Sequence, residues 1–124
     1  MLTEDFVSYE VARLFKEKGF DERTCGVYFD DSDETFLIST PSYHNKSINA
    51  IAAPTHQMAM KWLREEKGIA IIPVLSSVLD NEKFLWDIKI VVAKTHDIYY
   101  QGWTYEKQEA ACETAIKYCL TNLI

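Results

Sequence analysis

The 124-residue sequence has few of the residues that mark several functional classes. Its four glycines are isolated, so it has no glycine-rich phosphate-binding loop. No C-x-x-C pair occurs among Cys25, Cys112 and Cys119, which argues against a zinc site or a disulfide framework. No apolar run reaches the roughly 18 residues of a membrane-spanning helix. Because the first residues also lack a signal-peptide pattern, we expect a cytoplasmic protein.

Positive charge is scarce and is not clustered. The net charge is −6, with ten acidic and four basic side chains in residues 1–40 and nine of each in residues 41–124. Proteins that bind nucleic acid gain affinity when clustered Lys and Arg release counterions from phosphates. The sequence therefore predicts no broad phosphate-binding face, and we do not expect nucleic acid as the partner.

Residues typical of catalysis or metal binding are present, but their spacing does not fit a site. The acidic run Asp30–Glu34 fails as an EF-hand loop, since its sixth and twelfth positions are Thr35 and Pro41, where Gly and Glu are needed. No Ser or Cys stands in a nucleophile elbow. The spacing of the three histidines does not fit a set of metal ligands. They are His44, His56 and His96. We therefore expect no catalytic, cofactor-binding or metal-binding residue, and an enzyme is not the favoured interpretation.

The clearest structural signal is a helix from Pro54 to Lys67, followed at once by a strand. Proline suits the first helical turn, where its missing N–H has no partner. Gly68 stands where a left-handed residue ends a helix. Residues spaced three and four apart would form one face of this helix. They are Thr55, Met58, Ala59, Trp62, Leu63 and Glu66.

Two further helices and several strands are expected around this element. The first helix would run from Glu4 to Lys18 behind a Thr3 cap, and Phe20 would fold back onto its last turn. The last helix would start at a Thr104 cap. Expected strands cover residues 25–29, 35–39, 69–78, 84–94 and 98–103.

Two of these strands have predictable places in a sheet, and one segment has no regular pattern. Pro73 cannot donate to a ladder, so the strand 69–78 should lie at an edge or carry a bulge. The strand 84–94 alternates clearly and should be central, with its even-numbered side chains toward helices. Residues 40–53 have the composition of a loop.

The expected fold class is α+β, in one domain over residues 1–124. The order is helix, β-hairpin, helix, three-stranded antiparallel meander and C-terminal helix, with a single sheet and helices mainly on one face. Residues 1–40 would add a helix-and-hairpin layer to an α-β-β-β-α unit over residues 54–124.

One segment also carries a resemblance. The pattern APT-x-Q-x-x-x-KWLRE from Ala53, followed by a glycine and a strand, and the later Tyr105-Glu106-x-x-Glu109-Ala110 helix resemble a family of small uncharacterised proteins. That family occurs in gut Bacteroidetes and their phages and prophages. The resemblance implies a fold unit and a setting, and it implies no activity.

The favoured function is a non-enzymatic accessory or interaction protein that acts through protein contacts, with a protein partner or a second copy of the chain. Its expected interaction surface comprises Tyr43, His44, His56, Met60 and Arg64. The alternative is a nucleic-acid-associated module, because the α-β-β-β-α order is similar to the double-stranded-RNA-binding fold. A third interpretation is a small enzyme with a site near His56 and the 40–53 segment.

Overall fold

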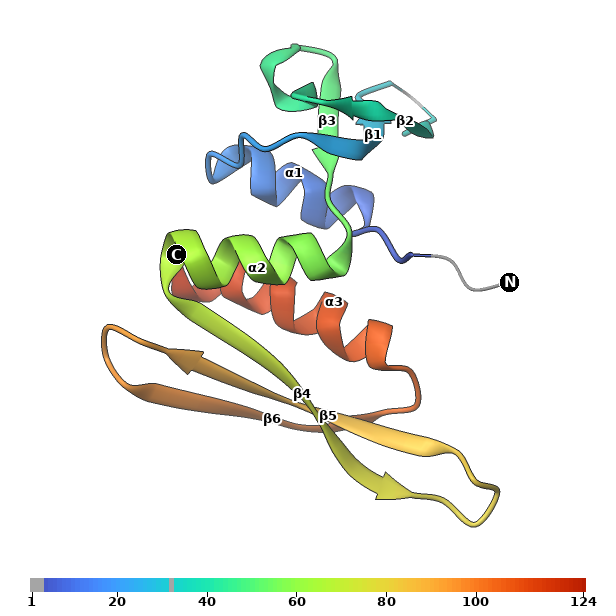
Figure 1. Cartoon of the computed structure of the whole chain (residues 1–124), viewed down its shortest axis with the longest axis vertical. Coiled ribbons are helices and arrows are strands. Elements are labelled where there is room, and N and C mark those ends of the chain that lie inside the picture. The colour runs from blue at the N-terminus through green and yellow to red at the C-terminus, as the bar shows by residue number, and fades with distance from the viewer. Residues whose placement is uncertain (1–3, 32) are drawn as a thin grey trace.

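The computed structural model describes residues 4–31 and 33–124, with only the backbone of residues 101–103, and over this range it shows an α+β fold of two three-stranded antiparallel sheets. The helices α1, α2 and α3 lie between the two sheets (Figure 1). The expected class is confirmed. The single sheet with helices mainly on one face is wrong, because the segment expected to be a loop supplies a strand of a separate sheet.

The first helix is shorter than its periodicity predicts. Helix α1 spans Tyr9–Glu17 and is capped by Ser8, whose hydroxyl accepts from the Val11 N–H at 3.3 Å. The residues before it are extended, since Val7 N–H donates to Pro54 C=O at 3.0 Å. The expected helical start at Glu4 is therefore wrong, and the expected cap Thr3 lies outside the described residues.

The end of α1 is as the sequence predicts. Gly19 adopts a positive φ of 86°, which a glycine tolerates without a steric penalty. The Phe20 N–H then donates to Phe15 C=O at 3.0 Å, and the two rings pack with centroids 5.3 Å apart. Phe20 thus folds back onto the last turn of α1.

The first sheet has the strand order β2-β1-β3, formed by Thr24–Phe29 (β1), Phe36–Ser42 (β2) and Ala50–Ala53 (β3). Residues 40–53 are therefore not an irregular loop: they hold the end of β2, a short 3-10 helix His44–Lys46 and the fully buried β3. A polar residue of this segment has a structural role instead. The Asn45 side chain donates to Phe20 C=O at 2.8 Å and accepts from the Ala52 N–H at 2.7 Å, so it fixes the path into β3.

Helix α2 spans His56–Lys67 and leads directly into β4, Ile69–Val78. Its cap is Thr55, which accepts from the Met58 N–H at 3.2 Å, so Pro54 precedes the helix and does not occupy its first turn. Gly68 ends α2 with φ 66°, as the sequence predicts.

The second sheet has the order β4-β5-β6, with β5 at Phe84–Val92 and β6 at Asp97–Tyr105. Strand β4, which contains Pro73, is an edge strand and β5 is central, and both placements confirm the sequence prediction. Helix α3, Gln108–Tyr118, begins after Lys107, because β6 continues through the expected Thr104 cap. A π-helical turn, Cys119–Leu123, follows α3.

The core lies where α2 and α3 cover one face of the second sheet. Its fully buried side chains include Leu63, Ile88, Ile90, Ile116 and Leu120, while Trp86 is half-buried. The side chain of Trp103 lies outside the described part of the structure. Within residues 4–31 and 33–124, no helix combines the length and apolar character needed to cross a membrane.

Candidate functional site

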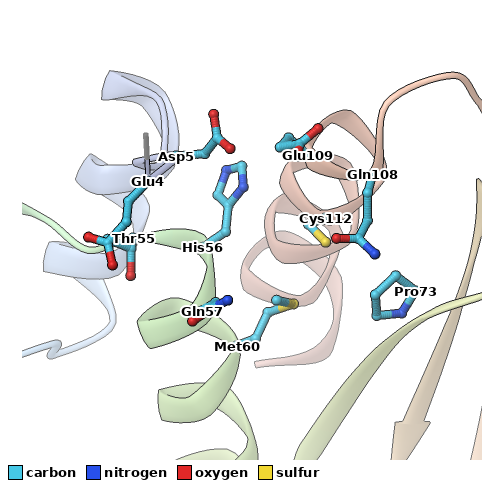
Figure 2. Close-up of a pocket in the computed structure, with 10 residues that line it drawn as sticks. All are labelled: Glu4, Asp5, Thr55, His56, Gln57, Met60, Pro73, Gln108, Glu109 and Cys112. Carbon is cyan, nitrogen blue, oxygen red and sulfur yellow. The ribbon is translucent and has the colours of Figure 1, made fainter. Parts of the chain in front are cut away.

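A polar pocket opens where the extended N-terminal segment meets the starts of α2 and α3 (Figure 2). Its volume is about 390 Å³, which is within the rough 300–1,000 Å³ range of small-molecule pockets. Its lining is mostly polar, unlike that of most such pockets: Glu4, Asp5, Thr55, His56, Gln57, Met60, Pro73, Gln108, Glu109 and Cys112.

His56 is held in this pocket from two sides. Its backbone N–H donates to Asp5 C=O at 2.9 Å, and its ring Nε2 lies 3.2 Å from Oε1 of Glu113 on α3. The same Glu113 oxygen accepts the Ser8 N–H at 2.9 Å. The His56 side chain is only 11% exposed. One carboxylate therefore joins α3 to the start of α2 and to the cap of α1.

The second oxygen of Glu113 has no partner. Oε2 is buried and makes no hydrogen bond with any described group. The side chain as a whole is 28% exposed, so solvent reaches other parts of it. No sequence pattern singles out Glu113, because its contact with His56 depends on how α2 and α3 pack.

Cys112 also faces the pocket, but its thiol is not an activated nucleophile. Burial raises the pKa of Cys112 to about 11, and the negative charges of Glu109 and Glu113 act in the same direction. A nucleophilic cysteine needs a lowered pKa, usually from a neighbouring positive charge. In the described part of the chain, no group of three or more His, Cys, Asp or Glu is placed to hold a metal ion. The arrangement is suited to holding polar groups by hydrogen bonds rather than to covalent catalysis.

The five residues expected to form an interaction surface do not lie on one surface. His56 and Met60 line the polar pocket, whereas Tyr43 lines a second depression of about 280 Å³ beside Trp62. His44 begins the 3-10 helix before β3 and is half-buried. Arg64 is exposed on α2.

A different surface is the side of the second sheet that faces away from α2 and α3, where no element of the described chain covers it (Figure 1). Alternation places buried Ile88 and Ile90 toward the helices, so the intervening positions of the sheet point outward. We call this surface the outer face and define it by Ala70, Ile72, Val74, Asp87, Lys89, Val91, Ile98 and Tyr100.

Most of the outer face is apolar. The exposed fractions are 43% for Ile72, 40% for Val74, 51% for Ile98 and 67% for Tyr100. The register aligns these side chains in rows across the three strands, such as Ile72, Lys89 and Tyr100. Exposed apolar residues that are contiguous mark interaction sites more often than scattered ones do.

Two opposite charges lie in the middle of the outer face, two residues apart on β5. The Lys89 ammonium lies 6.0 Å from the Tyr100 ring centroid, and an Asp87 carboxylate oxygen accepts the Ile88 N–H at 2.7 Å. In the described chain, neither charge has an ion-pair partner within 4.0 Å. A signal for this face was present in the sequence, because apolar residues occupy both odd and even positions from Ile69 to Val74.

Comparison of the chain with protein-family models, curated proteins and solved structures finds no match. The resemblance of the Ala53 segment to proteins of gut Bacteroidetes and their phages therefore stays a prediction.

Proposed function

We propose that the chain is a non-enzymatic interaction protein that binds another protein through the outer face. The observation that carries this proposal is the uncovered apolar side of the β4-β5-β6 sheet. Tyr100, in the cross-strand row with Ile72 and Lys89, is 67% exposed there. Tyrosine is enriched at protein interfaces, and burial of apolar area is the main favourable term in association. The resemblance supports a phage or prophage setting for this contact.

The outer face is also suited to binding because it is held rigidly. Its residues stand on three paired strands, and the opposite side of the sheet is anchored by fully buried Ile88 and Ile90. A preorganised surface loses little conformational entropy when it binds. The polar pocket supports an enzyme less well, since the thiol of Cys112 stays protonated at neutral pH.

The element order α2-β4-β5-β6-α3 is the one observation that favours a nucleic-acid-associated module. The charges oppose it. Double-stranded-RNA-binding domains place lysines at the start of the last helix, whereas here Lys107 stands between Glu106 and Glu109. We therefore propose protein as the partner, with nucleic acid as the second candidate.

A photo-crosslinking amino acid in place of Tyr100, introduced into the protein in its native cells, tests this proposal. Irradiation should give a covalent adduct with a protein, because position 100 would lie inside the contact. A matched probe replaces Ile48, which is 92% exposed and outside the outer face, and should give little adduct. Equal yields from the two positions, or no protein adduct from position 100, would contradict the proposal.

A further inference from the structure

We infer that the outer face binds a second copy of this chain, face to face, with Asp87 of each copy opposite Lys89 of the other. This inference rests on the proposed function, because it names the partner of the same surface. It follows from the charges of the outer face, since one acid and one base on a central strand form a pattern that is complementary to itself.

The geometry needs one symmetry axis. The two copies would be related by a two-fold axis that lies midway between their β4-β5-β6 sheets, at right angles to β5 and level with Ile88. Under this axis β5 of one copy runs opposite in direction to β5 of the other. Such an axis brings Asp87 opposite Lys89 of the partner subunit, and Lys89 opposite Asp87 of the partner subunit. Packed sheets lie about 10 Å apart, a gap that a lysine and an aspartate side chain can span together.

The apolar residues of β4 match under the same axis. Ile72 pairs with Lys89 and Val74 pairs with Asp87 across the β4-β5 ladder, so Ile72 would lie opposite Val74 of the partner subunit. Both side chains are exposed in the single chain, at 43% and 40%. An isologous contact of this kind buries apolar flanks around two reciprocal ion pairs.

A partner without this charge pattern would bind at a cost. A charge that is buried at an interface without an opposite charge loses hydration and gains nothing in return. Asp87 and Lys89 lack ion-pair partners in the described chain, so the bound surface must supply one cation and one carboxylate at the matching spacing. A second copy supplies both.

The face is also a better contact than the neighbouring edge of the sheet. Strand β4 is an edge strand with Pro73 near its middle. Proline has no N–H to donate, and its presence on an edge interrupts the addition of another strand. Pairing through this edge is therefore disfavoured, whereas stacking on the outer face is not affected by Pro73.

Charge reversal tests the inference with the purified 124-residue chain. Sedimentation analysis should show a dimer for the wild type. Lys89→Asp and Asp87→Lys should each raise the dissociation constant at least about tenfold, because each places like charges opposite one another. The double variant should restore the dimer. An equimolar mixture of the two single variants should form a heterodimer, since all facing charges are then opposite.

Folding is checked by comparing the circular dichroism of each variant with that of the wild type. A wild type that stays monomeric at about 100 µM, a concentration that would reveal even weak association, would overturn the inference. So would a dimer with the same dissociation constant in both single variants. If the chain is monomeric but position 100 still crosslinks to another protein in cells, the proposed function stands and the inferred partner is wrong. If neither occurs, both are wrong.

Discussion

The ring of His56 at the start of α2 and the carboxylate of Glu113 in the middle of α3 join two helices that are distant in sequence, with Nε2 and Oε1 3.2 Å apart. The Glu113 oxygen also accepts the Ser8 N–H at 2.9 Å. A single side chain on α3 therefore fixes the positions of α1 and α2 around the polar pocket.

Removal of this carboxylate should destabilise the fold. Glu113→Ala should lower the free energy of unfolding by about 1–3 kcal/mol, because the Ser8 N–H and the His56 ring lose their acceptor. Glu113→Gln keeps one acceptor oxygen and puts its amide nitrogen in the place of the unpartnered Oε2, so it should cost less. Urea unfolding measures both. Equal losses for the two variants would contradict this expectation and show that a neutral acceptor oxygen in the place of Oε1 does not stabilise the fold.

Gly26 should not tolerate a side chain. A Cβ at this position would lie 2.6 Å from Ala53 O and 2.7 Å from the Phe6 ring. Gly26→Ala should therefore cost about 1–3 kcal/mol of stability, as overpacking usually does. The loss should be smaller in a Phe6→Ala background, where the ring contact is absent. A double-mutant cycle by urea unfolding measures this coupling, and identical losses in both backgrounds would contradict the packing of Phe6 over β1.

Truncation of a side chain on the buried side of β5 should lower stability more than the changes at Glu113 and Gly26. Ile88 is 1% exposed, and Ile88→Ala should lower stability by about 2–5 kcal/mol through the cavity it leaves. Ile48→Ala is the matched control, since Ile48 is 92% exposed and should change stability by less than about 0.5 kcal/mol. A loss below about 0.5 kcal/mol for Ile88→Ala in urea melts would be incompatible with the assigned strand face.

The thiols of the last helix should be unreactive in the folded protein. Burial is the main cause that raises the pKa of Cys112 to about 11 and that of Cys119 to about 12. Because thiolates are the reactive form, alkylation at pH 8 should modify these two cysteines slowly in the native chain and rapidly in urea. Mass spectrometry locates the label. Native labelling of Cys112 at the unfolded rate would refute its burial.

The raised pKa values of Cys112 and Cys119 predict that the folded protein becomes less stable at high pH. The folded chain holds these two thiol protons more tightly than an unfolded chain, whose thiols titrate near 9.0. Their contribution is fully present below pH 9.0 and is lost as the pH rises toward the folded values of about 11 and 12. The free energy of unfolding should therefore fall over this range.

Local sequence patterns were enough to predict several elements. The end of α2 at Gly68, the return of Phe20 and the central place of β5 all follow from short-range rules on glycine, packing and alternation. The start of α1 did not follow them. Residues before Tyr9 have helical propensity, but their pairing with Pro54 and Thr55 outweighs it.

Predicting the β2-β1-β3 sheet and the candidate sites would have needed knowledge of contacts between residues distant in sequence. Strand β3 has four residues, and its pairing with β1 depends on the space that Gly26 leaves. The contact of His56 with Glu113 joins residues 57 positions apart. The outer face was largely predictable, since the even-numbered side chains of residues 84–94 were expected to face helices and Ile88 and Ile90 are buried on that side.

Hydroxyl-radical footprinting of the protein in its native cells tests most directly whether the outer face makes a protein contact. Tyr100 is 67% exposed and Tyr43 is 45% exposed in the single chain, so dilute purified protein should be oxidised more at Tyr100. A contact through the outer face predicts the reverse order in cells, where Tyr100 would be covered and Tyr43 would not. An unchanged preference for Tyr100 in cells would contradict it.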